Sequence, residues 1–125
     1  MGWEPYKLDK VAHDLVVVVV ETRKNQQDVL KQVYKMRTTV AYGLERFWGE
    51  QLRLEGEEAA YWKATWKKLV EIMALAEIEV PNLENPSAQI SELWKFPQDD
   101  RKVTLAVLTQ LCDCMVWWTQ RYKKA

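Results

Sequence analysis

The sequence contains few of the residues from which catalytic sites are usually built. Its 125 residues include one histidine, two cysteines and four glycines. A hydrolase or transferase normally shows a nucleophile beside a positionable base, and only His13 is present to act as a histidine base. The glycines are too widely spaced to form a phosphate-cradling loop. The composition therefore argues against an enzyme and predicts no cofactor.

His13 and the two cysteines each allow a weak chemical interpretation. Asp9 lies one helical turn before His13 and Asp14 follows it, so these three residues could form a metal-binding or acid–base site. A surface or boundary histidine with a carboxylate neighbour is the commoner arrangement, and we favour it. Cys112 and Cys114 are too close for a typical zinc pair, lack two further ligands and diverge on a helix. We expect them to be packing residues in a reducing compartment.

The chain also lacks net charge and long apolar runs. It carries 18 basic and 18 acidic residues, so any contact with nucleic acid must come from a local face. The longest apolar run, 15–20, is far shorter than the roughly 18 residues of a membrane span. The first residues show no secretory leader. We therefore expect a cytoplasmic protein that does not enter a membrane.

The remaining composition favours a folded, helical chain. Hydrophobic residues make up 48% and charged residues 29%, which is unlike a disordered protein. Proline and glycine are sparse and divide the sequence into helix-length intervals. These features predict an all-α fold, with residues 1–125 forming a single compact helical bundle of four to five helices.

Hydrophobic periodicity places the first two helices. The spacing predicts a helix from about Tyr6 to Lys24, although the β-branched run Val16 to Val20 leaves a buried strand as the alternative. A second helix is expected from Asn25 up to Gly56. Within it, Gly43 and Gly49 predict either a break or the close approach of another helix.

The second half of the chain is expected to form two long helices joined by a proline-containing loop. After Gly56, apolar residues alternate by three and four from Ala59 to Val80, the seam spacing of packed helices. The loop, 78–98, is expected to hold one short helix near Ser87 to Trp94. The last helix is expected from about Asp99 to Lys123. It would have acidic residues in its first turn and basic residues in its last turn, which suits the helix dipole.

Seven tryptophans are the most unusual feature of the composition. Such side chains are costly to expose and favour cores and interfaces. Trp62, Trp66 and Trp118 lie on predicted core faces, where packing is a commoner role than base stacking. The tryptophans that fit the main stripes less well are predicted to form an interface, and they are Trp3, Trp48, Trp94 and Trp117.

Basic residues form local groups despite the neutral total. Lys24, Lys31 and Lys35 lie near one helical face, and Lys63 and Lys67 form an i,i+4 pair. Arg121 and Lys123 belong to a basic C-terminus. Such groups could follow the phosphates of a nucleic acid. A solvated face balanced by nearby acidic residues is the alternative.

The C-terminal segment resembles a known family. Thr109, Trp118, Arg121 and Tyr122 match the spacing in the last helix of the small α-helical subunit of type III-B (Cmr) CRISPR effector complexes. The dipeptide Gly43-Leu44 is similar to one at the end of an early helix in that family. Tyr42 replaces the usual asparagine, Gln120 replaces a basic residue, and a preceding proline is missing.

The resemblance implies a non-catalytic subunit of an RNA-guided complex in antiviral defence. Such a subunit stacks on copies of itself, assembles with other subunits, and contacts the backbone of the guide–target RNA duplex through basic residues. Among the matched positions, Arg121 is the one implied to touch phosphate. The alternative from another class is a homo-oligomeric helical-bundle adaptor that binds protein partners and no nucleic acid.

Overall fold

The structure is a computed structural model that describes residues 5–22 and 26–123. Within these ranges it contains helices and no strand, which confirms the all-α prediction. The helices are α1 (Pro5–Thr22), α2 (Gln26–Leu30), α3 (Gln32–Thr39), the 3-10 helix η1 (Val40–Tyr42), α4 (Leu44–Arg53), α5 (Gly56–Leu75), α6 (Pro86–Lys95) and α7 (Gln98–Lys123).

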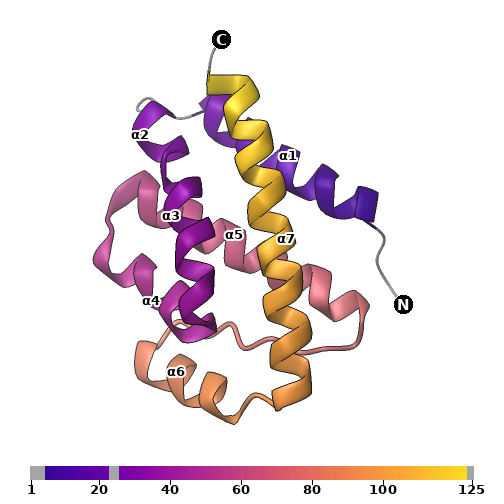
Figure 1. Ribbon diagram of the computed structural model, residues 1–125. Coiled ribbons are helices and arrows are strands. Elements are labelled where there is room, and N and C mark those ends of the chain that lie inside the picture. Colours follow the sequence, from indigo (N-terminus) through magenta and orange to yellow (C-terminus); the bar gives the residue numbers. More distant parts are fainter. Residues whose placement is uncertain (1–4, 23–25, 124–125) are drawn as a thin grey trace.

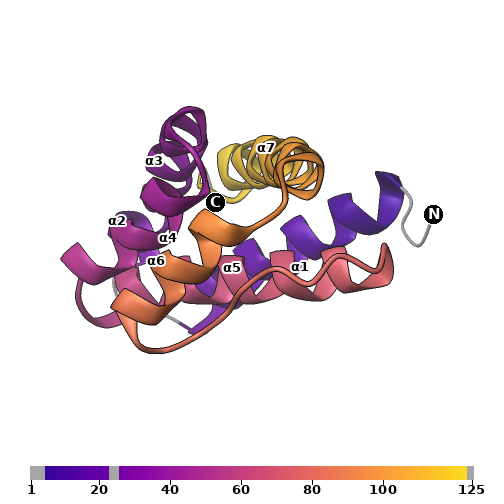
Figure 2. The same cartoon turned by 90° about the horizontal axis from the view of Figure 1, so that it is seen from below.

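The longest helix, α7, packs against α1 and α3 and crosses the front of the molecule (Figure 1). Seen from below, α3 and α7 lie on one side, whereas α1 and α5 lie on the other (Figure 2). The hydrophobic core fills the space between them, and every helix contributes to it. Met36 of α3, Leu69 of α5 and Leu111 of α7 are all completely buried.

The predicted first helix is present as α1, and the strand alternative for Val16 to Val20 is wrong. Val16 and Val19 are buried, whereas Val18 between them is exposed. This three-residue spacing is helical, because alternate residues of a strand would share one face. The valine run therefore belongs to one buried helical stripe.

The predicted count of four to five helices is too low, because the expected helix from Asn25 to Gly56 is divided. It is interrupted at Lys31 and again after η1, where Gly43 has a φ of +100°. A side chain is strained at that angle, so glycine allows the chain to restart as α4. Gly43 therefore marks a break, as predicted. Gly49 lies inside α4, and a Cβ added there would meet nothing within 4 Å.

The helix that follows Gly56 ends earlier than its apolar seam predicts. The helix α5 stops at Leu75, shortly before the loop expected from residue 78, since Glu77 adopts a positive φ of 61°. Val80, the last residue of the apolar spacing, therefore lies outside the helix. The backbone N–H groups of Glu77 and Ile78 bind carbonyl oxygens in the last turn of α5, each at 3.0 Å. Such bonds typically close a helix C-terminus.

The predicted short helix near Ser87 to Trp94 is present as α6. The side chain of Asn85 caps it by accepting a hydrogen bond of 3.0 Å from the N–H of Ala88. Pro86 occupies the first turn, where its missing N–H costs nothing. The final helix α7 begins at Gln98 and has acidic residues in its first turn, as predicted.

Candidate nucleic-acid interface

A groove of about 560 Å³ brings three of the predicted site residues together: Trp48, Lys63 and Lys67. It lies between α4, α5 and the segment that follows α5, and we call it the α4–α5 groove. Its lining consists of Trp48, Gln51, Leu52, Lys63, Trp66, Lys67, Asn82, Leu83 and Glu84.

Aromatic packing between α4 and α5 forms the floor of this groove. The ring of Phe47 lies 4.8 Å from the ring of Trp62 and 6.3 Å from that of Trp66, centroid to centroid. Trp48 and Trp66 also line the groove, although each is almost completely buried. The floor therefore consists of two nearly buried indole rings, which expose little surface to a ligand.

The expectation that Trp48 is exposed is wrong, because only 4% of its surface is accessible. Leu44, Phe47 and Trp48 follow the three-and-four spacing of one helical face, and this face of α4 is buried. Trp48 can reach a ligand only through the groove.

A hydrogen-bond network holds the third wall of the groove in place. The carbonyl oxygen of Pro81 accepts one bond from Nε1 of Trp66 at 3.0 Å and another from Nε2 of Gln89 at 2.9 Å. The Oε1 atom of Gln89 accepts the backbone N–H of Leu83 at 2.7 Å. Gln89 is completely buried, and the three bonds themselves are partly buried. The wall is therefore preformed.

The charged side chains of the lining are two lysines and one glutamate. Lys63 and Lys67 are exposed and lie one helical turn apart on α5, whereas Glu84 comes from the third wall. Leu52 and Leu83 add exposed apolar surface to the groove. Paired ammonium groups bind phosphate oxygens, and the leucine side chains provide apolar contact. The lining therefore suits an anionic ligand with an apolar part.

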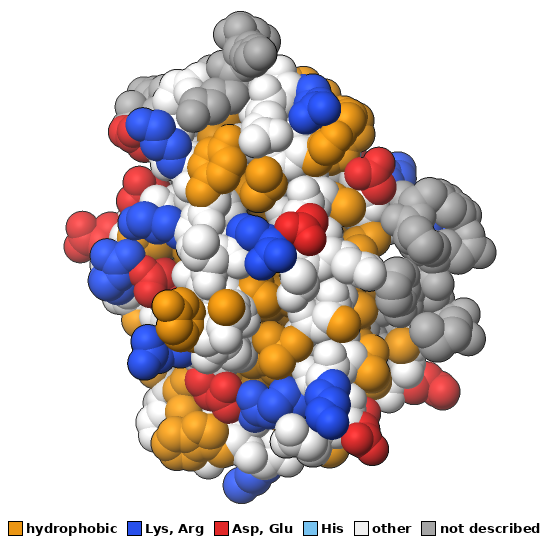
Figure 3. Space-filling view, viewed as in Figure 1, with side chains coloured by type: hydrophobic (Ala, Val, Ile, Leu, Met, Phe, Trp, Pro, Cys, Tyr) orange, Lys and Arg blue, Asp and Glu red, His pale blue; other side chains and the backbone are white. Residues whose placement is uncertain are grey.

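The other predicted lysines do not join this groove. Lys35 is exposed on α3 and Lys31 is exposed just before that helix, and neither belongs to the groove lining. Lys24 lies outside the described residues. On the face shown in Figure 3, Lys and Arg side chains are scattered among acidic, polar and hydrophobic ones. The predicted basic residues are thus distributed over several surfaces.

Arg121 and Trp117 form an exposed pair near the end of α7. The guanidinium carbon of Arg121 lies 3.6 Å from the centre of the Trp117 ring. The Nη1 atom of Arg121 also donates a bond of 3.2 Å to the carbonyl of Trp117. Both residues are exposed, so they offer a cation stacked on an aromatic ring. Lys123 is the last residue of α7, and its side chain lies outside the description.

His13 belongs to a contact between α1 and α7. Its ring stacks edge-on against Trp118, with 4.4 Å between centroids, and Nε1 of Trp118 donates a bond of 3.0 Å to Asp9. Trp118 was predicted to lie on a core-facing side of its helix, and it is partly buried and packs against the core.

Cys112 is buried, and burial raises the pKa of its thiol to about 12. In the described residues, no cluster of three His, Cys, Asp or Glu side chains could hold a metal.

Two further predicted interface residues lie elsewhere. Trp94 on α6 is 72% exposed, the most exposed large hydrophobic side chain in the described part of the chain. Trp3 lies outside the described residues. The lining residues that the sequence did not single out as site residues are Gln51, Leu52, Trp66, Asn82, Leu83 and Glu84. The last three come from the proline-containing loop, which Gln89 of α6 holds in place. Composition gave no signal for them, because their role depends on contacts with α5.

Comparisons with known proteins identify no relative of this chain. No protein-family model matches the chain, and no curated protein or solved structure is significantly similar to it. None of the helices in 5–22 and 26–123 has the length and apolar character needed to cross a membrane.

Proposed function

We propose that this chain is a non-catalytic helical subunit of a ribonucleoprotein complex and contacts the nucleic-acid backbone through the α4–α5 groove. The observation that carries the proposal is the placement of Lys63 and Lys67 beside a groove floored by Trp48 and Trp66. Two cations one turn apart fit successive phosphates, while the exposed Leu52 and Leu83 provide apolar contact beside them. The neutral total charge predicts weak binding by the isolated chain, strengthened when several copies assemble.

The type III-B CRISPR small subunit is the specific complex component that we propose. At Gly43-Leu44, the positive φ of Gly43 favours glycine, and the Leu44 side chain is buried. Arg121 is exposed, as a phosphate contact requires, and Trp118 packs against the core. In this proposal copies of the chain stack on one another and on other subunits along the guide–target duplex.

The test measures binding of a fluorescein-labelled 20-nucleotide RNA, single-stranded and as a duplex, by fluorescence anisotropy at low salt. Replacing both Lys63 and Lys67 by alanine should weaken binding by about ten-fold or more, because two phosphate contacts are lost. The matched control is Lys95→Ala with Lys102→Ala, which removes the same charge from exposed positions on α6 and α7. Equal affinities for the two double variants would contradict the proposal.

A protein adaptor is the second candidate function, and Trp94 favours it. A tryptophan that is 72% exposed on α6 is suited to anchor a partner. If neither RNA form binds the parent chain at low salt, while Trp94→Ala abolishes association with copies of itself, the adaptor function replaces the RNA-binding one.

A further inference from the structure

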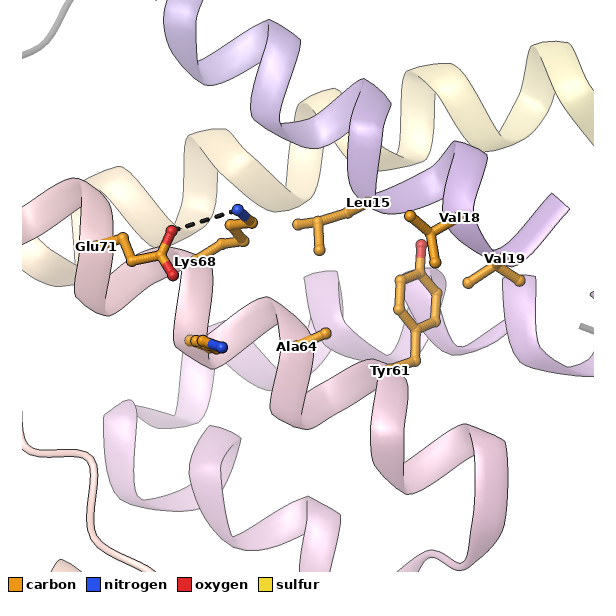
Figure 4. Close-up of a pocket in the computed structure, with 8 residues that line it drawn as sticks. Leu15, Val18, Val19, Tyr61, Ala64, Lys68 and Glu71 are labelled. Atoms are coloured by element: carbon orange, nitrogen blue, oxygen red, sulfur yellow. Dashed lines mark hydrogen bonds and ion pairs between the residues drawn. The ribbon is translucent and has the colours of Figure 1, made fainter. Parts of the chain in front are cut away.

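A second groove runs between α1 and α5 and contains two apolar sockets. The first socket, of about 330 Å³, is lined by Lys7, Leu8, Lys10, Val11, Ile72 and Leu75. The second socket, of about 260 Å³, is lined by Leu15, Val18, Val19, Tyr61, Ala64, Lys67, Lys68 and Glu71 (Figure 4). Together they form what we call the α1–α5 groove.

The two sockets are spaced like the anchor positions of a helix. On α1, Leu8 belongs to the first socket and Leu15 to the second, and seven helical residues span about 10.5 Å. Val11 and Val18 repeat the same spacing. A partner helix with apolar side chains seven residues apart would place one anchor in each socket. Separate sockets suit side chains better than one continuous ligand.

Each socket has one large apolar side chain that remains exposed. Val18 is 49% exposed at the second socket, and Leu75 is 55% exposed at the first. Their neighbours on the groove floor, including Leu8 and Leu15, are buried. Covering Val18 and Leu75 would remove apolar surface from water at both ends of the groove.

The second socket also contains a hydroxyl group without a partner. Tyr61 is only 2% exposed, and its hydroxyl oxygen has no hydrogen-bond partner. Figure 4 shows the ring rising from α5 towards Leu15 and Val18 of α1. This hydroxyl is closed off from solvent, so the socket offers a partner its apolar lining.

The charges beside the sockets identify the kind of partner. Four lysines line the groove, against Glu71 as the one acid in the two linings. Glu71 is already paired with Lys68 at 3.3 Å, and Lys10 pairs with Asp14 at 2.9 Å. Lys7 and Lys67 supply the remaining positive charge, one on each helix, and favour acidic residues beside the partner's apolar stripe.

The geometry points to docking of an acidic amphipathic helix from another protein in the α1–α5 groove. This inference goes beyond the proposed contact with nucleic acid and rests on different residues, except that Lys67 lines both grooves. Variants of Lys63 therefore test only the contact with nucleic acid. Variants of Lys7 and Lys10, which line the first socket, test only the docking of the helix.

The probe is a fluorescein-labelled synthetic helix of about 18 residues, with leucines seven residues apart flanked by glutamates. Its binding is followed by anisotropy on the full chain. Val18→Asp with Leu75→Asp should weaken binding about ten-fold or more. The probe's leucines would then meet charged side chains, and its glutamates would be repelled by the new aspartates. Val103→Asp is the matched control, since Val103 is similarly exposed (41%) but lies on α7. Circular dichroism checks that each variant is folded.

Three further measurements fix the site and the partner. Amide chemical shifts should change around Val11, Val18 and Leu75 when the probe is added. Lys7→Glu with Lys10→Glu should reverse the preference for the acidic probe over the same helix carrying lysines. Lys63→Ala should weaken RNA binding and leave the probe unaffected. Equal binding by Val18→Asp/Leu75→Asp and Val103→Asp, or shifts confined to another surface, would overturn the inference. Self-association abolished by Val18→Asp, seen by sedimentation, would replace the acidic partner with a second copy.

Discussion

The Nε2 atom of His13 lies 2.7 Å from the hydroxyl oxygen of Tyr122, which joins α1 to the last turn of α7. The two residues are 109 positions apart in the chain. The bond from Trp118 to Asp9 lies beside them and joins the same two helices. These contacts fix the end of α7 that carries Trp117 and Arg121.

Replacing Tyr122 by phenylalanine removes this bond while keeping the ring. We expect the free energy of unfolding to fall by about 1 kcal/mol, the usual net value of a hydrogen bond. Urea denaturation followed by circular dichroism measures the change. An unchanged midpoint would show that the contact between His13 and Tyr122 adds nothing to stability.

Trp66 and Trp94 form a matched pair of tryptophans, one buried and one exposed. Trp66→Ala should lower the free energy of unfolding by about 3–5 kcal/mol, because it empties a packed site beside Phe47. Trp94→Ala should change it by less than about 0.5 kcal/mol. Denaturant titrations of both variants give the comparison, and similar losses for the two would contradict the described core.

Glu45 and Arg101 form a two-bond ion pair, with oxygen–nitrogen distances of 2.9 and 2.8 Å. Burial of Glu45 acts to raise its pKa, but the hydrogen bonds from Arg101 and the backbone and the Arg101 charge outweigh it, and the pKa falls below 4.5. The charged form is thus favoured by folding. Its stabilising effect is present above pH 4.5 and is lost as the pH falls through the lowered pKa.

Glu45→Gln removes this titrating group and tests the assignment. Between about pH 6 and pH 3, the parent should lose more stability than the variant, because other carboxylates titrate in both. Urea midpoints at several pH values measure the difference. Parallel pH profiles would show that the ion pair does not stabilise the folded state.

Removal of divalent metals should leave the fold unchanged. The cysteines and His13 are accounted for by packing and by the contact with Tyr122, and no metal cluster occurs in residues 5–22 and 26–123. Circular dichroism and melting in the presence of a chelator provide the measurement. Loss of helicity on chelation would require a metal site.

Periodicity predicted the helices well because apolar side chains must share a face in order to be buried. It located α1 and α7 and placed Trp62 and Trp66 in the core, whereas α6 was predicted from signals within the proline-containing loop. Trp48 was assigned to an interface, although it shares the buried face of α4 with Leu44 and Phe47. Periodicity also cannot show where a helix ends when the next residues remain apolar, as at Val80.

The candidate site was predicted only as separate residues. The i,i+4 spacing showed that Lys63 and Lys67 share a face, because that relation is local. Their position opposite the 82–84 wall depends on Gln89, which binds Pro81 and Leu83 across the loop. Contacts of this kind join the loop to α6 and α5. The spacing of residues within one segment does not show where another segment packs against it. The two apolar sockets between α1 and α5 were missed for the same reason.

The salt dependence of RNA affinity tests the proposed backbone contact most directly, because it counts phosphates. The logarithm of affinity for a single strand falls with the logarithm of salt concentration by about 0.7 per phosphate contact. Lys63→Ala with Lys67→Ala should therefore flatten the slope by about 1.4, since two contacts are lost. Lys95→Ala with Lys102→Ala should keep the parent slope. Equal slopes for the parent and the Lys63/Lys67 variant would contradict the assignment of the α4–α5 groove to nucleic acid.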